Sequence, residues 1–581
     1  MLQFLKYSLA TVFGLMLFCV LGFFLLLGIA SVAGKKDATK VESNSVLLLD
    51  FKGPVLERTP EDPFAKLRGE TPALGLKEIL ENIDKAANDD HIKGILLDLG
   101  TVSAGSAAKD EIRAALKAFQ AKGKFIYSRA DYYYNGNYYL ASLADKIFLT
   151  PSGEMLFNGT AAEPMFYKGF LDKIGVEIQV VRHGRFKGAV EPFIKDKLSE
   201  ENRLQIRQYK ESLFMNLIHA VAQDRKMSED EVRSVAYEMK IRSAEDAVNL
   251  HLVDQLAYTD QIYAAIREKL GMKENETIKF ITYSKYKDAP SKSKDGDINN
   301  KIAVIYAQGE IQDGEGDDNT IGGSSLSETM RKARLDDKIK AIVFRINSPG
   351  GSALASDIIW REVKLAAEKK PVIVSMGDVA ASGGYYIAAP ATFIFAEPST
   401  ITGSIGVFGM YPNAQKLLND KLGITTDTVK LGRYSDLGNA SRPFTEDEKK
   451  IVQQFIEKVY DDFISRVAEG RKKQKADVDS IAQGRVWAAN DALNLGLVDK
   501  IGSLDDAIKL AAEKAGVSSY HITRMPAMKN PVEEMIKSLS GETRMKQALQ
   551  SELGENYALY QQLQSLQKKQ GIRMELLWWT N

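Results

Sequence analysis

Residues 371–387 read PVIVSMGDVAASGGYYI, and 247 positions earlier residues 124–140 read KFIYSRADYYYNGNYYL. The two stretches align without a gap. Each begins with a short apolar run, passes through small or polar residues, and continues into a second run with helical character. This order is typical of a buried strand that turns into a helix. The chain therefore carries this unit twice.

Three further pairs of stretches repeat in the same order and at nearly the same spacing. They are IKGILLDLG (92–100) with IKAIVFRIN (339–347), SAEDAVNLHLVDQL (243–256) with AANDALNLGLVDKI (488–501), and VLLLDFKGPV (46–55) with AVIYAQGEI (303–311). A period of about 250 residues is far too long for a solenoid repeat. The pattern indicates that a whole domain was duplicated in tandem.

Short apolar runs alternate with longer amphipathic ones in each copy. In the second copy the expected strands are IAVIYA, AIVFRI, PVIVSM, TFIFAE and TDTVK, and the expected helices include LSETMRKARLDD and ASDIIWREVKLAAEKK. Strands that are apolar throughout are normally buried on both faces, as in a parallel sheet covered by helices. The predicted fold class is therefore α/β.

Composition changes along the chain predict five segments. The polar stretch SKYKDAPSKSKDGDINNK is rich in Lys, Asp and Ser and reads as a linker between the copies. The predicted segments are an anchor and tether (1–45), an N-terminal repeat (46–283), the linker (284–301), a C-terminal repeat (302–516) and a C-terminal extension (517–581). In the extension, Trp578 and Trp579 are expected to pack on the protein's own surface, and docking on a neighbour or a lipid interface is the alternative.

The N-terminal segment predicts a membrane anchor. No charged residue occurs from Ser8 to Ala33, where Leu, Phe, Val and Gly dominate. About 25 helical residues are enough to cross a bilayer with some tilt. The apolar run is longer than that of a cleaved signal peptide, although Ser31 and Ala33 would suit a signal-peptidase site. Flanking lysines do not settle the orientation of the anchor.

Composition excludes several function classes. The formal net charge is zero, so no global basic field indicates nucleic-acid binding. The only cysteine is Cys19, within the apolar run, and the five histidines show no metal-binding spacing. We therefore expect neither a cofactor nor a metal site.

The two copies differ in a reciprocal way at two aligned positions. Ser382 in the second copy corresponds to Asn135 in the first, whereas Lys187 in the first copy corresponds to Ser435 in the second. Each copy thus retains one half of a possible Ser/Lys pair. A lysine can serve as the base for a serine nucleophile if burial lowers its pKa from ~10.4 to near neutrality. The pattern suggests one active site shared by both copies.

Glycines near Ser382 are candidates for an oxyanion hole. Ser382 follows a strand and precedes a helix, where backbone N–H groups are unpaired and favour negative charge. Gly383 comes directly after it, and NSPGGS (347–352) places Gly350 and Gly351 after another strand. Both stretches are also compatible with ordinary tight turns, so neither motif alone decides the function.

Taken together, these motifs resemble a known family. The N-terminal anchor, the duplication, NSPGGS, DVAASGGYYIAA, TGSIGVFG and GRFKGAVEPF are similar to those of the long, double-domain form of bacterial signal peptide peptidase A. The resemblance implies a Clp-protease/crotonase-like superhelical fold, with Ser382 as the nucleophile and Lys187 as the general base. It also implies that Ser404, in TGSIG, positions the lysine and that Gly383 and the Pro-Gly-Gly turn form the oxyanion hole.

The resemblance extends to location and partners. It implies a single-pass protein of the bacterial cytoplasmic membrane with a periplasmic catalytic body, assembled as a homo-oligomer, a tetramer in the family. Its substrates would be cleaved signal peptides and other short hydrophobic peptides. Two other functions stay open at this point: acyl-CoA chemistry on the same fold, which would favour acidic catalytic residues, and a non-catalytic membrane scaffold.

Overall fold

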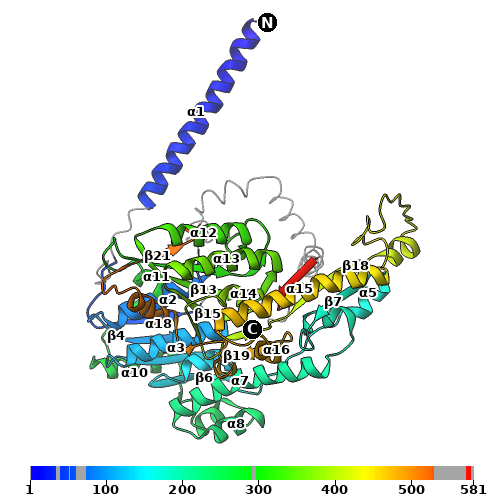
Figure 1. The fold of residues 1–581 in the computed structure, drawn as a ribbon. Helices are drawn as coiled ribbons and strands as arrows, with labels where there is room; N and C mark the ends of the chain where they lie inside the picture. Colours follow the sequence, from blue (N-terminus) through cyan, green and yellow to red (C-terminus); the bar gives the residue numbers. More distant parts are fainter. Residues whose placement is uncertain are drawn as a thin grey trace.

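Two sheets, one from each half of the chain, form the centre of the protein, and their strands are parallel except for β19 at one edge of the second sheet. The computed structural model describes residues 2–33, 39–51, 53–59, 73–290, 296–528 and 571–576. Figure 1 shows helices packed around the strands of both halves. The α/β fold class predicted from the alternation of strands and helices is confirmed.

The first sheet has the order β8-β6-β5-β4-β1-β9, and all of its strands are parallel. Its strands are β1 (Ser45–Asp50), β4 (Ile92–Asp98), β5 (Phe125–Tyr134), β6 (Lys146–Leu156), β8 (Gln255–Leu256) and β9 (Lys279–Thr282). The helices of this half include α2 (Leu76–Ala87), α3 (Ser106–Gln120), α4 (Asn135–Ala141), α7 (Glu200–Arg225), α8 (Glu229–Tyr237), α9 (Ala244–Asn249) and α10 (Thr259–Leu270).

The second sheet repeats this order. Its path is β19-β17-β15-β13-β10-β21, and β16 joins β15 to β20. Its strands are β10 (Lys301–Gln308), β13 (Ile339–Ser348), β15 (Val372–Ala381), β16 (Phe393–Ala396), β17 (Ile401–Gly403), β19 (Val486–Ala488), β20 (Lys500–Ile501) and β21 (His521–Met525). The helices include α12 (Gly323–Leu335), α13 (Ala353–Lys369), α14 (Gly383–Ala388), α15 (Glu446–Arg471), α16 (Lys475–Ile481), α17 (Ala489–Asn494) and α18 (Leu504–Lys514).

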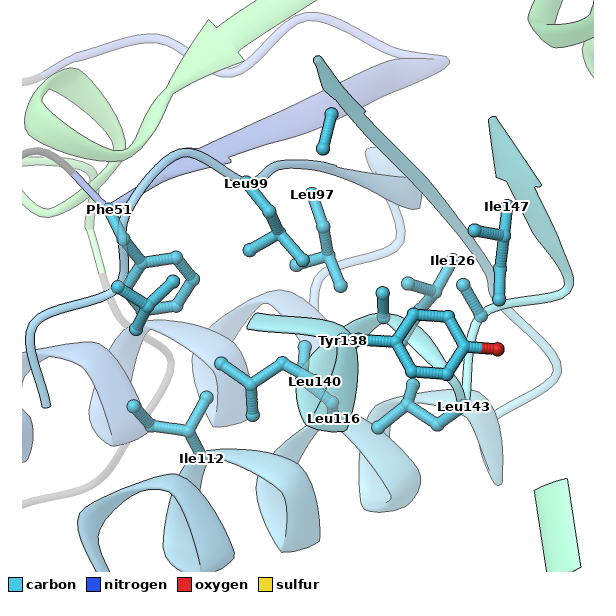
Figure 2. Packing of buried hydrophobic residues seen from close by; sticks show 14 of the residues in the cluster. Phe51, Leu97, Leu99, Ile112, Leu116, Ile126, Tyr138, Leu140, Leu143 and Ile147 are labelled. Carbon is cyan, nitrogen blue, oxygen red and sulfur yellow. The ribbon is translucent and has the colours of Figure 1, made fainter. Parts of the chain in front are cut away.

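Each half has its own hydrophobic core between sheet and helices. In the first half, Leu97 and Ile126 from the strands face Ile112 and Leu116 of α3, with Tyr138 of α4 between them (Figure 2). All five side chains are buried. A core of this kind is what the apolar, β-branched strands of the sequence predict.

A third, smaller sheet joins the two halves. Its order is β12-β11-β14-β22-β18-β7, and only β7 comes from the first half. The strands are β7 (Glu177–His183), β11 (Glu310–Gln312), β12 (Thr320–Gly322), β14 (Gly350–Ser352), β18 (Val407–Asn413) and β22 (Gly571–Glu575). Strands β7 and β18 pair antiparallel over their whole length. This pairing brings residues just after β7 to the second half.

Three sequence expectations differ from the structure. The expected strand TDTVK (426–430) has no regular structure, and Val429 in it is 93% exposed, because no neighbouring strand pairs with it in the described chain. Residues 284–301 were expected to be a linker, yet Tyr286 is fully buried in the first core. Strand β21 pairs with β10, as β9 pairs with β1, so the second sheet continues past the predicted boundary at 516.

The N-terminal segment forms helix α1 (Leu2–Ala33). Among the residues that the structure describes, none of the helices was found long and apolar enough to cross a membrane. The membrane anchor therefore stays a prediction. Trp578 and Trp579 lie outside the described residues.

Candidate active site

Ser382 lies at the junction of β15 and α14 in a backbone conformation that few side chains adopt. Its φ is 56° and its ψ is −117°. Its N–H donates to Gly403 O at 2.8 Å, and its carbonyl accepts from Tyr386 N of α14. Non-glycine residues held at such angles cost about 1–3 kcal/mol and occur mainly at functional sites. The surrounding structure holds Ser382 in this conformation, because β15 before it and α14 after it are both buried.

Ser404 lies beside Ser382 because their strands pair. Strands β15 and β17 are parallel, and their last pair joins Ala381 to Gly403. Ser382 and Ser404 are the residues that directly follow these two paired strand ends. Ser404 also has a positive φ of 50°, and its N–H donates to Arg485 O at 2.7 Å.

Lys187 reaches the same place from the first half. It follows β7, whose pairing with β18 carries the chain across to the second half. The turn is fixed from both sides, since Phe186 N donates to Gln483 O at 2.9 Å and Arg182 Nη1 donates to Lys187 O at 3.0 Å. Gln205 of α7 adds a further link, with Nε2 donating to Phe186 O at 2.9 Å.

The three side chains meet in the interior. Lys187 Nζ lies 2.8 Å from Ser382 Oγ and 3.0 Å from Ser404 Oγ. It also donates to Ser404 O at 3.1 Å. Lys187, Ser382 and Ser404 are at most 1% exposed. The lysine thus has three oxygen acceptors and almost no contact with solvent.

Burial changes the charge state of the lysine. Transfer from water disfavours an ammonium ion, and it lowers the pKa of Lys187 to about 7, while the negative charge of Glu575 opposes the shift. A substantial fraction of Lys187 is therefore neutral near pH 7. A neutral amine 2.8 Å from a hydroxyl is able to accept its proton.

Two of the three candidate glycines, Gly350 and Gly383, lie against each other beside Ser382. Gly350 and Gly351 have φ values of 98° and 155°, which favour glycine. A Cβ atom on Gly350 would lie 2.6 Å from Gly383 N, so the two backbones are in direct contact. The N–H of Gly350 already donates to Ser348 Oγ at 3.2 Å. Gly351 lies in β14 against the backbone of Ile311 of β11, so Gly383, Gly350 and Gly351 all stay candidates for oxyanion donors.

The sequence was compared with known families and proteins. The model of peptidase family S49 matches it twice, over residues 118–273 and 364–518. Protease 4 from Salmonella typhi is 35% identical over 540 residues, which cover 89% of this chain and 86% of the relative.

The chain belongs to peptidase family S49. Its two matched segments give it the long, double-domain organisation of the signal peptide peptidase A type. A protein from Enterococcus faecium named as a signal peptide peptidase SppA is 35% identical over 37% of this chain and 64% of the relative. A ClpP1 mutant from Listeria monocytogenes matches 35% of this chain and 94% of its own, with 19% identity and a TM-score of 0.23. The Clp-protease/crotonase type of superhelix stays a prediction.

In this S49 peptidase, the positions that align with Ser382 and Lys187 in the other copy of the domain have different environments. Asn135, the counterpart of Ser382, donates through Nδ2 to Asn158 O at 2.7 Å and accepts from Asn158 N at 3.2 Å. Ser435, the counterpart of Lys187, lies in an exposed turn and bonds to Gly432. Asn135 thus bonds to a residue further along the first half, and Ser435 bonds within its own turn.

Sequence reasoning missed the contribution of the C-terminal segment to this S49 site. Glu575 is close enough to Lys187 to affect its pKa. Leu576 lines a cavity of about 20 Å³ together with Phe186, Lys187 and Ser404. The five-residue strand GIRME shows no clear periodicity, and β18, its partner, lies more than 150 residues before it in the chain.

Proposed function

We propose that this protein is a serine endopeptidase in which Ser382 is the nucleophile and Lys187 the general base. The observation that carries the proposal is the buried contact of 2.8 Å between Lys187 Nζ and Ser382 Oγ. It joins the two positions at which the copies of the domain differ reciprocally. No histidine takes part in this contact, so the lysine is the base at hand.

The reaction proceeds in two stages. Neutral Lys187 takes the proton from Ser382 Oγ as the oxygen attacks the peptide carbonyl, and backbone N–H groups of Gly383 and of the Pro-Gly-Gly turn stabilise the oxyanion. The lysine then protonates the leaving amine, which leaves an acyl-enzyme. Water hydrolyses the ester after giving a proton to Lys187, and Ser382 recovers its proton. Ser404 is a positioning residue that holds Lys187 Nζ next to Ser382 Oγ.

Local strain argues against a non-catalytic scaffold. A lysine without solvent and two serines with positive φ each oppose folding. A purely structural protein would gain nothing from retaining these unfavourable features. Acyl-CoA chemistry is the second alternative, and it would leave Ser382 without a covalent role.

The proposed substrates are short hydrophobic peptides, including cleaved signal peptides. The double-domain organisation and the name of the Enterococcus faecium relative, a signal peptide peptidase, support this assignment. We further propose that α1 anchors the protein in the bacterial cytoplasmic membrane, with the catalytic body on the periplasmic side. Such an anchor would hold the enzyme where cleaved signal peptides are concentrated.

The proposal includes a homo-oligomer, which the contact between the two halves supports. Asp378 of the second half accepts from Ala107 N at 2.8 Å and Ala108 N at 3.2 Å, at the start of α3. Ser399 N donates to Asp110 Oδ2 at 2.9 Å. The second half thus has a surface that receives a helix start from the first half.

The same pair of surfaces is present a second time at the two ends of the tandem. Leu354 and Ile358 of α13, the counterparts of Ala107 and Glu111, are 63% and 42% exposed. Asp131, the counterpart of Asp378, lines a cavity of about 200 Å³ with Asp98. A second copy that places α13 in this cavity would repeat the internal contact from chain to chain. The head-to-tail geometry closes a ring if the rotation permits, and the resemblance suggests four copies.

The test of the proposed activity uses a serine-directed phosphonate probe and one short hydrophobic peptide. The wild-type chain should hydrolyse the peptide and carry one probe adduct on Ser382, identified by mass spectrometry of its peptides. The Ser382→Ala variant should show neither. Peptide hydrolysis by a folded Ser382→Ala variant would exclude Ser382 as the nucleophile.

A further inference from the structure

A loop of three residues in the second half contacts the turn that carries Lys187. The loop, residues 483–485, lies between α16 and β19. Gln483 O accepts from Phe186 N at 2.9 Å, so the residue before the lysine is bonded to the loop. A Cβ atom on Gly484 would lie 2.7 Å from Lys187 N, which means that the two backbones touch. The loop therefore sets where the main chain of the lysine lies.

The same loop also holds Ser404. Arg485 O accepts from Ser404 N at 2.7 Å, and Gly484 N donates to Ile405 O at 2.7 Å. Ser404 Oγ donates to Gly484 O at 3.4 Å. A displacement of the loop would therefore move Ser404 and the Lys187 turn relative to Ser382.

Tyr460 of α15 fixes the first residue of the loop. Gln483 has a positive φ of 54°, a conformation that persists in a residue with a side chain where the surroundings hold it. The Tyr460 hydroxyl accepts from Gln483 N and from Gln483 Nε2, each at 3.3 Å, and it donates to Asp479 Oδ1. Gln483 Nε2 also donates to Asp479 Oδ1 at 2.7 Å. The hydroxyl thus uses its donor and both of its acceptor positions.

The ring of Tyr460 contacts the strand that leads to Lys187. Helix α15 packs beside β7 (Figure 1). The ring stacks on His183, the last residue of β7, with the two ring centroids 3.7 Å apart. His183 Nδ1 lies 2.6 Å from Glu457 Oε2, one turn earlier in α15. Tyr460 therefore touches both the strand before the lysine turn and the loop behind it.

The first copy of the domain lacks this network of Tyr460, Asp479 and Gln483. Helices α7 and α15 both have 26 residues, and each ends before a lysine with positive φ, so the two copies align here without a gap. The three positions differ in chemistry: Tyr460 aligns with Phe214, Asp479 with Arg233 and Gln483 with Tyr237. Phe214 and Tyr237 stack with their centroids 5.4 Å apart. The hydrogen-bonded network thus belongs to the copy whose loop contacts the lysine.

We propose that Tyr460 is a positioning residue of the active site and that it acts through the loop 483–485. Its hydroxyl fixes the loop, and the loop holds Lys187 Nζ next to Ser382 Oγ. This inference rests on the proposed peptidase function. Tyr460 is not among the described residues that line the cavity beside Lys187, so its effect reaches the reaction through the loop.

Loss of the hydroxyl should change the catalytic step and leave substrate binding intact. Tyr460→Phe keeps the ring against His183 and removes the acceptor of Gln483 N. We expect kcat on one short hydrophobic peptide to fall about tenfold with KM unchanged, because the base is misplaced. The pH of half-maximal kcat should rise, since burial lowers the pKa of Lys187 and a looser turn admits water. A merely structural role would not move this pH profile.

Two further comparisons control for general effects of the substitution. Tyr286→Phe removes a buried hydroxyl of the first half that donates to Asp89 Oδ2 at 3.1 Å, and it should retain wild-type kinetics. Asp479→Asn keeps an oxygen acceptor for the Tyr460 hydroxyl, whereas Asp479→Ala keeps none. The Asn variant should therefore retain more of kcat than the Ala variant, which should behave like Tyr460→Phe.

The deciding experiment adds a measurement that does not depend on turnover. Hydrogen–deuterium exchange of the full-length chain, read by mass spectrometry, follows fragments that contain Phe186 N and Ser404 N. Both groups donate to the loop, so their exchange in Tyr460→Phe should be at least about fivefold faster than in the wild type. Tyr286→Phe should exchange there at the wild-type rate. Circular dichroism verifies that each variant folds.

Three results would overturn the inference. Unchanged exchange at Phe186 in a folded Tyr460→Phe chain would mean that the hydroxyl does not hold the loop. Faster exchange with unchanged kcat and pH profile would mean that the loop does not position the lysine. A higher KM at constant kcat would assign Tyr460 to substrate binding. A wild-type chain that hydrolyses no peptide would refute the peptidase function, and the exchange rates would still decide whether Tyr460 holds the Lys187 turn.

Discussion

Lys187 Nζ and Ser382 Oγ are 2.8 Å apart, although the two residues are separated by 195 positions and come from different copies of the domain. Neither copy contains both groups. The contact exists because β7 of the first half pairs with β18 of the second and delivers the lysine across the boundary. The two halves therefore depend on each other for the proposed chemistry.

Substitutions of Lys187 should distinguish a role of its positive charge from a role in accepting a proton. Lys187→Arg should reduce kcat by at least about 10³, as much as Lys187→Ala, because a guanidinium does not deprotonate in the working range. Steady-state kinetics on one short hydrophobic peptide measures the effect. Near-normal turnover of the Arg variant would show that position 187 supplies only positive charge.

Loss of the Ser404 hydroxyl should have a smaller effect. Ser404→Ala removes one of the three acceptors of Lys187 Nζ, at 3.0 Å, and leaves Ser382 Oγ in place. We expect kcat to fall about tenfold, or about 1.4 kcal/mol, with an altered pH dependence. Ser435→Ala, in the exposed counterpart position of the lysine, is the control and should retain wild-type kinetics. An unchanged kcat and pH profile in Ser404→Ala would exclude the positioning role.

The buried ion pair between the halves should be needed for stability. Arg345 is 1% exposed and pairs with Glu57 at 2.9 Å and with Glu111. Arg345→Ala leaves two buried carboxylates without their cation, which should cost about 3–5 kcal/mol and lower the urea midpoint. The control is Arg331→Ala, whose side chain is 50% exposed and pairs with Glu362, and it should cost less than about 1 kcal/mol. Equal midpoints in both variants would contradict this account.

Deletion of residues 1–45 tests the proposed anchor. The full-length chain should float with phosphatidylcholine vesicles in a density gradient, because α1 carries the long uncharged run from Ser8 to Ala33. The shortened chain should stay at the bottom and retain peptide hydrolysis, since the deleted segment holds none of the site residues. Flotation of the shortened chain would place the membrane contact elsewhere.

Much of the fold was predictable because the two copies of the duplicated domain can be aligned with each other. The aligned copies indicated the strands that became β4 with β13 and β5 with β15, and the reciprocal difference at Asn135 and Ser435 indicated the lysine. The close approach of Gly350 to Gly383 could not be predicted, because it depends on how the turn before β14 packs against the turn after β15.

The third sheet could not be predicted from the sequence. It combines short strands from distant parts of the chain, and pairing between such strands depends on tertiary contacts more than on local propensity. The stretch TDTVK has strand-forming residues, yet it forms no strand in the described chain and is exposed. The strand GIRME has weaker propensity and is nevertheless paired on both sides.

The most direct test of the central claim is the pH dependence of probe labelling at Ser382. Burial lowers the pKa of Lys187 to about 7, and the lysine must be neutral to act as the base. The labelling rate of the wild-type chain should therefore rise with pH through about 7 and level off above it. In Lys187→Ala the rate should be far lower and this transition absent. A Lys187→Ala chain with the wild-type rate and the same transition near pH 7 would contradict the Ser/Lys pair.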